Sequence, residues 1–321
     1  MEYTTDRYSE ESSKWNENSG VRVSKANFEG LIEEMACDTS GRKGLTLPNS
    51  SALLAHPNLT GLDDHKRDFV RGIQLLEFLM KQTIFEIRFV NEVASEIAQD
   101  RTQFHFPQQL KTDALKIYTD EGYHAYYTEL LASQLRSYYS VTKQDIQPYV
   151  DSHFDALVRW LEAEGRDALS LRKFALVLVS ESQIVSDISS QLHDVLYEPI
   201  KALFREHMKD EVFHARYFQE ALGILWSQLV PGQREIFSRA IVESMSLIGA
   251  PRLRIYEFSL SKLGYTIEDI RRMTEDIYGT SRWKVDFIRE RMRPTVRVLQ
   301  RCGLLEYDYL ATLLKRRSYV D

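Results

Sequence analysis

Residues 119–127 read TDEGYHAYY and residues 209–217 read KDEVFHARY, so the pattern Asp-Glu-x-x-His occurs twice in the chain. Residues three apart lie on the same face of an α-helix, and the glutamate and the histidine of each segment can therefore reach one point. Two helices that each carry Glu-x-x-His are typical of four-helix bundles that bind a pair of metal ions. The two segments therefore predict an all-α protein with a ferritin-like four-helix bundle core.

Such a bundle requires two further glutamates, one on the helix before each Glu-x-x-His segment. Glu86 lies in the apolar segment TIFEIRFV before the first of them, and Glu181 lies in VLVSESQIV before the second. A carboxylate among apolar side chains is costly unless it binds something. Glu92 is a second candidate on the helix of Glu86, but its polar neighbours indicate an exposed face, and helical phase favours Glu86. The order of glutamate and Glu-x-x-His, found twice, resembles an internal duplication of a two-helix unit.

A third histidine distinguishes the second half of this pattern from the first. His207 lies one helical turn before Glu211 and two turns before His214, so the three side chains share a face. The first half has Ile117 at the matching position, and the two metal ions are therefore expected to differ in their ligands. The predicted metal ligands are Glu86, Glu121, His124, Glu181, His207, Glu211 and His214.

The two aspartates that precede the glutamates, Asp120 and Asp210, are candidates for supporting contacts. A carboxylate that accepts a hydrogen bond from the ring nitrogen not bound to metal fixes the tautomer of a metal-binding histidine. The sequence leaves open which histidine each aspartate orients. The adjacent tyrosines are interpreted as packing residues of the bundle rather than as a radical site; they are Tyr123, Tyr126 and Tyr127.

The ligand types indicate which metal to expect. Carboxylates and imidazoles without a thiolate favour iron or manganese over a soft metal. The chain has two cysteines, Cys37 and Cys302, which build neither a disulfide framework nor a thiolate site and fit a reducing compartment. The formal net charge of −6 provides no basic surface for nucleic acid. The N-terminus lacks a signal peptide and the apolar runs are too short to cross a bilayer, so a soluble cytoplasmic protein is expected.

Apolar residues recur at spacings of three and four along most of the chain and predict helices rather than strands. Residues 1–20 are polar and are predicted to be a flexible segment without function. Residues 21–321 are predicted to form a single helical domain with its metal-binding core at about 64–230. The predicted helices are 64–100, 107–135, 142–164, 170–196 and 199–229, followed by several helices broken at Pro251, Gly264, Gly279 and Gly303.

The ordered ligand set resembles the AurF-like family of di-iron N-oxygenases, which are similar to p-aminobenzoate N-oxygenase. The third histidine is the distinguishing mark, because ferritins, fatty-acyl desaturases and ribonucleotide reductase small subunits generally lack it. The resemblance covers about residues 55 to 230, with LLAHPNL at 53–59 before the first long helix. It implies that Glu121 and Glu211 bridge two iron ions. It further implies the grouping of the other ligands, with Glu86 and His124 on one iron and Glu181, His207 and His214 on the other.

The resemblance also implies an activity. Members of the family use O2 as co-substrate, and electrons from an external donor or redox partner, to oxidise an amine to a hydroxylamine, a nitroso or a nitro compound in secondary-metabolite biosynthesis. The family also implies a homodimer. The expected lining of the pocket is mostly apolar, which suits an arylamine or an amino-acid-derived amine, free or bound to a carrier protein; it consists of Leu79, Gln82, Thr83, Leu178 and Ile184.

Alternatives remain open at this point. A di-iron C–H hydroxylase or desaturase would need the same ligands, and a non-enzymatic iron-binding bundle would need no substrate pocket. Basic residues near the C-terminus are most often solvated helix faces, although they are also candidates for holding a carboxylate of the substrate; they are Arg291, Arg293 and Arg297.

Overall fold

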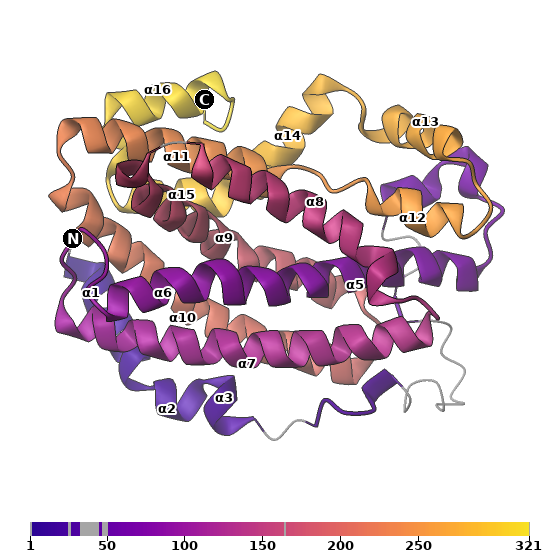
Figure 1. Ribbon diagram of the computed structural model, residues 1–321, viewed down its shortest axis with the longest axis horizontal. Helices are drawn as coiled ribbons and strands as arrows, with labels where there is room; N and C mark the ends of the chain where they lie inside the picture. The colour runs from indigo at the N-terminus through magenta and orange to yellow at the C-terminus, as the bar shows by residue number, and fades with distance from the viewer. Residues whose placement is uncertain (1, 25–26, 33–44, 47–50, 164, 321) are drawn as a thin grey trace.

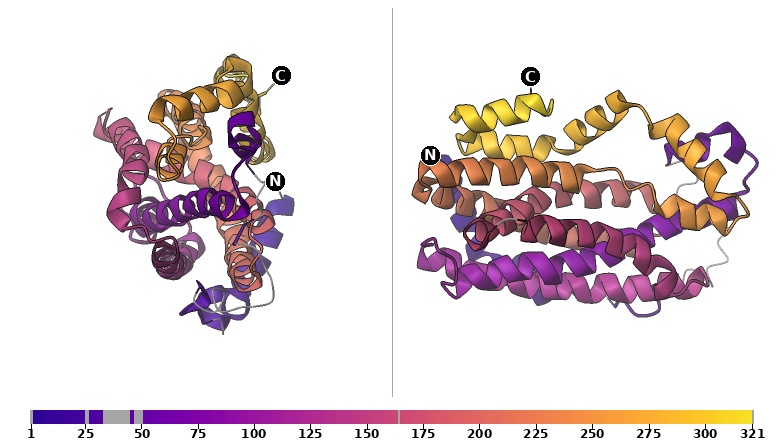
Figure 2. Two further views of the ribbon diagram at one scale, coloured as in Figure 1. Left: turned by 90° about the vertical axis from the view of Figure 1, so that its right-hand side faces the viewer. Right: turned by 45° about the horizontal axis from the view of Figure 1, so that its top comes forward.

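The structure, a computed structural model, describes residues 2–24, 27–32, 45–46, 51–163 and 165–320 (Figure 1). Four long helical segments run side by side and form the bundle, which Figure 2 shows from its end. These segments are α5 (Asp64–Phe85) with its continuation through η3 (Glu86–Val90) and α6 (Asn91–Ala98), then α7 (Gln108–Tyr138), α9 (Arg166–Asp194) and α10 (Glu198–Gln228). The all-α prediction is confirmed, and the described residues contain no strand.

Local chemistry explains where the bundle helices begin. The side chain of Asp63 accepts a hydrogen bond from the backbone N–H of Lys66 at 2.9 Å and so caps the start of α5. Proline lies in the first turn of α10, where its missing N–H costs nothing. The observed helix α9 begins four residues before the predicted position of 170, and the other bundle helices begin within one residue of prediction. The helical period of the sequence is therefore a reliable guide to this part of the fold.

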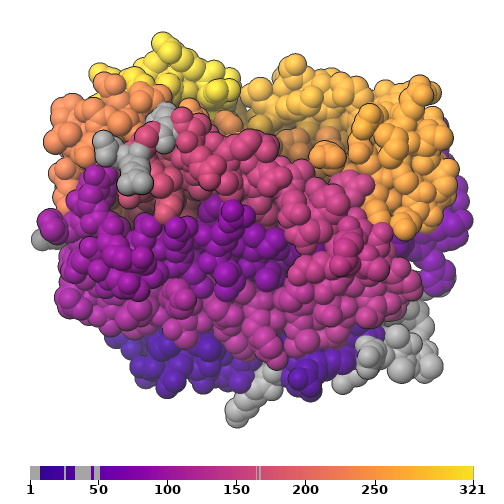
Figure 3. All heavy atoms as spheres, in the orientation of Figure 1, coloured from indigo at the N-terminus to yellow at the C-terminus, as the bar shows by residue number. Residues whose placement is uncertain are grey.

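Further helices cover one side and one end of the bundle. Helix α11 packs along α9, and the C-terminal helices lie against α9 and α11 (Figure 1). Side chains of the short helices η1 (Ala52–Ala55) and η2 (Pro57–Leu59) form a separate apolar cluster with α12 and α13. These segments lie at one end of the molecule (Figure 3). The additional helices are α8 (Lys143–Glu162), α11 (Pro231–Gly249), α12 (Ile255–Ser261), α13 (Ile267–Tyr278), α14 (Ser281–Arg291), α15 (Arg293–Arg301), η4 (Leu304–Glu306) and α16 (Asp308–Arg316). Among the described residues, no helix combines the length and the apolar character that a membrane crossing needs.

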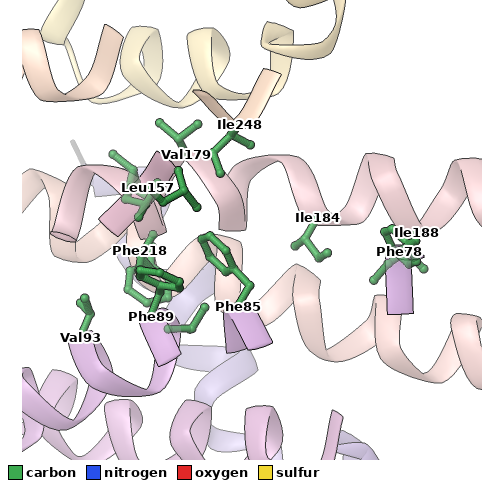
Figure 4. Packing of buried hydrophobic residues seen from close by; sticks show 14 of the residues in the cluster. Phe78, Phe85, Phe89, Val93, Leu157, Val179, Ile184, Ile188, Phe218 and Ile248 are labelled. Atoms are coloured by element: carbon green, nitrogen blue, oxygen red, sulfur yellow. The ribbon is translucent and has the colours of Figure 1, made fainter. Parts of the chain in front are cut away.

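Aromatic side chains fill the bundle interior next to Glu86. The rings of Phe85 and Phe89 have centroids 5.1 Å apart, and Phe89 lies 5.9 Å from Phe154 of α8. Figure 4 shows Phe85 and Phe89 pointing into the same apolar layer as Phe218 of α10. This packing excludes water, so a carboxylate placed beside it must be matched by a positive group or a metal ion.

Glu86 begins a turn of π-helix inside an otherwise α-helical segment. A π turn contains one extra residue, which shifts the side chains that follow to a different face, and such turns are frequent at functional sites. Glu86 is 3% exposed. Glu92 is exposed and binds the Lys173 ammonium, with Nζ 2.6 Å from Oε1. The burial of the two side chains therefore agrees with the choice of Glu86 over Glu92.

Residues 2–23 differ from the prediction of a flexible N-terminal segment. They form α1 (Glu2–Ser13), α2 (Trp15–Asn18) and α3 (Gly20–Val23), and α2 and α3 lie along α7 in Figure 1. The Tyr8 hydroxyl donates to the buried carboxylate of Asp113 on α7 at 2.5 Å. The prediction relied on low apolar content, but these helices are held by polar side chains that bind buried carboxylates of the bundle, which composition does not reveal.

Candidate metal centre

The four bundle segments bring all seven predicted ligand side chains to one buried point. None of the seven is more than 3% exposed. Each Glu-x-x-His segment lies in the middle of a long helix, and the helix that precedes it supplies one glutamate. The seven residues are Glu86 of η3, Glu121 and His124 of α7, Glu181 of α9, and His207, Glu211 and His214 of α10.

Two overlapping groups within this set have the spacing that a metal ion requires. In each group, one potential ligand atom per residue lies within 4.8 Å of all the others. His124 and Glu211 belong to both groups, so two ions bound here would be neighbours, and Glu211, with two carboxylate oxygens, is the residue that both could share. Glu181 lies beside the second group, with Oε2 3.9 Å from His214 Nδ1. The first group is Glu86, His124, His207 and Glu211, and the second is Glu121, His124, Glu211 and His214.

His207 lies in a different group from the one that the family resemblance implies. Its Nε2 is 2.7 Å from Glu211 Oε1 and 3.5 Å from Glu86 Oε1, and its ring centroid is 4.1 Å from that of His124. The expectation placed it with Glu181 and His214 instead. Helical periodicity correctly placed His207 and Glu211 on the same face of α10. Which neighbouring helix that face contacts depends on how α10 packs in the bundle. Burial and the nearby His124 lower the pKa of His207, which favours the neutral, metal-binding imidazole.

The two aspartates cross-link the halves of the centre. His124 Nε2 lies 3.0 Å from Asp210 Oδ2, and His214 Nε2 lies 3.2 Å from Asp120 Oδ2. Each aspartate therefore orients the histidine of the other Glu-x-x-His helix, which answers the question that the sequence left open. With Nε2–H donating to aspartate, the Nδ1 lone pair of each ring faces the carboxylates of Glu121 and Glu211 and is available to a metal ion.

Many polar atoms at this point have no hydrogen-bond partner, which is rare for buried groups. The carboxylates are crowded together at the centre of the bundle with their oxygens facing the imidazole rings. Atoms without a partner include both oxygens of Glu86 and Glu121, Oε2 of Glu181 and Glu211, and Nδ1 of His124, His207 and His214. Apart from His207, whose Nε2 faces Glu211 and Glu86, these are the atoms that would bind a pair of metal ions, and the donor set of carboxylate oxygen and imidazole nitrogen fits iron.

The electrostatics of the centre lead to the same conclusion. Burial and the neighbouring carboxylates raise the pKa of Glu86 and that of Glu181 well above the usual value. Burial alone would also raise the pKa of Glu211, but His214 and the other imidazoles hold it well below its usual value. Burial opposes charge on His124 and His214, yet hydrogen bonds and charges of the surrounding carboxylates raise the pKa of both. Without metal, protons must therefore supply the positive charge that the four carboxylates require.

The N-terminal helices contribute contacts that sequence reasoning missed. Trp15 Nε1 donates to Asp120 Oδ2 at 2.8 Å, and the Ser19 hydroxyl donates to Asp120 Oδ1 at 2.6 Å. The backbone N–H of Gly20 donates to both carboxylate oxygens of Asp210 at 3.1 and 3.2 Å. A tryptophan within an otherwise polar segment was the available signal that this segment packs on the bundle.

The sequence suggests that Tyr127 is a packing residue, and in the structure its ring also lies beside the metal centre. Its ring lies 5.6 Å from both His124 and His207, and its hydroxyl is buried without a hydrogen-bond partner. Tyr126, by contrast, is 57% exposed, and Tyr123 lies at the boundary, where its hydroxyl contacts Glu206. Of the three tyrosines, Tyr127 is therefore the one placed to contact a molecule bound at the centre.

A small cavity of about 20 Å³, enough for about one water molecule, is lined by Phe85 and Ser180, the sequence neighbours of Glu86 and Glu181, and by residues of α8 and α11. Two of the five residues expected to line a substrate pocket, Gln82 and Ile184, line it. Leu79 and Leu178 are instead buried in the core, and the Thr83 hydroxyl contacts that of Thr128. Charged residues that sequence reasoning did not include also line the cavity: Lys81, His153, Asp187 and Arg252.

Comparison with known proteins adds one match. The family model described as P-aminobenzoate N-oxygenase AurF matches residues 34–303. No curated protein matches the chain. The matched range contains all seven candidate ligands and both aspartates, and it begins after the N-terminal residues that bind those aspartates.

Proposed function

Because the chain belongs to the AurF family of p-aminobenzoate N-oxygenases, we propose that it is a di-iron oxygenase that uses O2 to N-oxygenate an amine. One observation carries the proposal: the seven side chains are buried together, and each has at least one oxygen or ring nitrogen without a hydrogen-bond partner. A bundle that binds no metal has no need for such a costly arrangement of charges, and the family match favours an oxygenase over an iron-storage bundle. Two bound iron ions would supply a redox centre at which O2 is reduced with electrons from an external donor.

The residues around the metals have distinct roles in this proposal. Glu211, which belongs to both ligand groups, would be shared by the two ions, and the family implies the same role for Glu121. His124 also belongs to both groups but offers one nitrogen, Nδ1, and would bind one ion. Asp120 and Asp210 keep the Nδ1 atoms of the histidines directed at the metals. The aromatic layer around Phe85 and Phe89 excludes water, which protects an oxidising centre from side reactions.

The substrate proposed for this centre is an amine that carries an anionic group. Two cations line the small cavity, Lys81 and Arg252, and a third, Arg291, binds Asp187 of its lining. Two of them bind acidic side chains, since Lys81 contacts Glu77 and Arg291 contacts Asp187. Burial and the charge of Arg291 lower the pKa of Arg252 to about 10, and its Nε has no hydrogen-bond partner.

In this proposal the side chains that line the cavity move to admit the substrate, whose acidic group pairs with Arg252 and whose amine extends toward Phe85 and Ser180, the neighbours of Glu86 and Glu181. Both an arylamine and an amino-acid-derived amine, free or carried by a protein, meet this requirement. The sequence suggests Arg291, Arg293 and Arg297 as candidates for binding a carboxylate of the substrate. In the structure Arg293 is instead paired with Glu290 at an exposed position.

The test is product analysis with labelled oxygen. The protein is loaded anaerobically with ferrous iron, mixed with amines that do or do not carry a carboxylate, and exposed to 18O2. We expect mass spectrometry to find labelled oxygen on the nitrogen of carboxylate-bearing amines, and Arg252→Ala to weaken the preference for them. Label on carbon, or a desaturated product, would assign the protein to C–H oxidation instead. Failure to bind two iron ions per chain would reject a di-iron oxygenase altogether.

The assembly and location of the protein are part of the same proposal. We expect a homodimer, as the family implies, and a reducing cytoplasmic setting, which suits a chain with two cysteines. Gel filtration with light scattering tests the oligomeric state directly. A large shell of subunits would instead favour iron storage.

A further inference from the structure

A chain of hydrogen bonds leads from the N-terminal helices to the candidate metal centre. The indole Nε1–H of Trp15 donates to Asp120 Oδ2 at 2.8 Å. The same oxygen lies 3.2 Å from His214 Nε2. On the other side of that ring, His214 Nδ1 lies 3.0 Å from Glu121 and 3.3 Å from Glu211. One carboxylate oxygen therefore separates the indole from a predicted metal ligand.

Of the residues in this series of hydrogen bonds, Trp15 is the one that reaches the surface. Its side chain is partly exposed and lines a groove between the N-terminal helices and α10, together with Lys209 and Val212. Asp120 and His214 are 0% exposed. The path thus begins at the solvent and continues through buried groups to the centre.

Electrons have to cross protein to reach this centre. All seven candidate ligands are at most 3% exposed, so a donor protein at the surface cannot touch the metals. Electron tunnelling is faster through covalent bonds and hydrogen bonds than across gaps of the same length, and it is aided by an extended aromatic system. The path through Trp15 contains covalent bonds, hydrogen bonds and the aromatic ring system of the indole.

The corresponding contact in the other half lacks an aromatic group. His124 Nε2 lies 3.0 Å from Asp210, as His214 does from Asp120. Asp210 is bound by the backbone N–H of Gly20, whereas Asp120 is bound by an indole. Within the part of the chain that the structure describes, the pair of His214 is therefore the one of the two histidine–aspartate pairs that an aromatic side chain extends.

We propose that Trp15, Asp120 and His214 form the route by which electrons from a one-electron donor at the surface reduce the di-iron centre. The inference rests on the proposed function. In each event the donor loses one electron, a ferric ion becomes ferrous, and Trp15 returns to its starting state. Two events reduce both ions. Trp15 is a positioning and conducting residue, and it touches neither substrate nor metal.

The test measures reduction of the iron rather than turnover. Iron-loaded, oxidised protein is mixed anaerobically with the methyl viologen radical in a stopped-flow instrument, and the loss of ferric absorbance is followed per bound iron. We expect Trp15→Phe, which keeps an aromatic ring for the cation–π contact with Arg22, to slow reduction roughly tenfold or more at unchanged iron content. Trp226→Phe, on α10 and packed on Tyr307 away from the centre, should reduce at the wild-type rate.

Ser19→Ala separates conduction from a structural role. Ser19 donates to the other oxygen of Asp120 at 2.6 Å, so its loss also loosens that carboxylate but leaves the indole contact in place. Conduction predicts a much smaller effect for Ser19→Ala than for Trp15→Phe. Equal slowing in the two variants, or wild-type reduction in Trp15→Phe, would overturn the inference. Either result leaves the proposed function standing, because that function fails only if the wild-type protein binds no iron pair or oxidises no amine.

Discussion

The two halves of the bundle carry the same ligand pattern in different surroundings. Both provide one glutamate and one Asp-Glu-x-x-His segment, and in both the aspartate binds the histidine of the other half. The first half has a π turn at Glu86 and an apolar, fully buried Ile117. The second half has His207 in place of Ile117. The repeated pattern therefore accounts for a symmetric pair of sites, and a few contacts outside the repeat make the two sites unequal.

The largest expected effect comes from Glu211, which lies in the second half and belongs to both ligand groups. Its carboxylate contacts all three imidazoles, with oxygens 2.7 Å from His207, 3.3 Å from His124 and 3.3 Å from His214. Glu211→Gln should abolish binding of both iron ions, because each loses a charged ligand. Colorimetric iron analysis after anaerobic loading measures this. The control is Glu92→Gln, at an exposed position that should still bind two ions; a full pair of irons in Glu211→Gln would contradict the shared role.

The matching positions His207 and Ile117 give the most direct comparison of the two halves. We expect His207→Ala to remain folded and helical but to bind less than the full pair of irons, since one site loses a nitrogen ligand. For Ile117→Ala we expect the opposite result, a loss of stability without a loss of bound iron. It creates a cavity that costs about 2–5 kcal/mol of unfolding free energy and should leave the iron stoichiometry intact. Iron analysis and denaturant titration of both variants measure the two effects, and an unchanged stoichiometry in His207→Ala would remove that residue from the ligand set.

The aspartates test whether the cross-links are equivalent. Asp120→Asn and Asp210→Asn each remove a charged partner from a predicted metal-binding histidine, and each should weaken iron binding by roughly 10- to 100-fold. Equal losses would mean that the symmetric contacts dominate. A larger loss for one variant would show which half depends more on the N-terminal helices. Competition with a ferrous chelator at fixed pH provides the affinities.

Iron affinity should rise with pH. The raised pKa values of Glu86, Glu181, His124 and His214 mean that the metal-free centre holds protons that iron must displace. Raised folded-state pKa values also stabilise the metal-free protein at low pH, and this contribution is lost as pH rises through them. Chelator competition and thermal unfolding between about pH 6 and 8 should therefore show tighter iron binding and a less stable metal-free protein at the higher pH. An affinity that falls with pH would contradict the assigned protonation.

The smallest expected effect is at Gly20. A Cβ atom there would lie 3.0 Å from Asp210 Oδ2 and 3.0 Å from Glu206 Oε1, so Gly20→Ala requires the carboxylate that orients His124 to shift by a few tenths of an ångström. The expected cost is about 1–3 kcal/mol of unfolding free energy, with a modest loss of iron affinity. Gly122→Ala on α7 is a suitable control, because nothing lies within 4 Å of the added atom. Equal behaviour of the two variants would mean that the contact between α3 and Asp210 has no influence on the centre.

Much of the fold and of the candidate site could be predicted from the sequence because both depend on local spacing. The helical period placed the bundle helices within a few residues, and three-residue spacing placed Glu121 with His124 and Glu211 with His214. The choice of Glu86 also followed from its apolar neighbours. Polar composition, in contrast, was a poor guide to residues 2–23, because their contacts to the bundle are hydrogen bonds between residues about a hundred positions apart.

The sequence by itself therefore determined that the protein is a helical bundle with two Glu-x-x-His helices, and which side chains share each helix face. Only the tertiary structure decided which faces meet. It grouped His207 with Glu86, paired each aspartate with the histidine of the other half, and placed Trp15 against Asp120. The physical reason is that backbone geometry specifies neighbours within one helix, whereas contacts between helices depend on how all the side chains pack together.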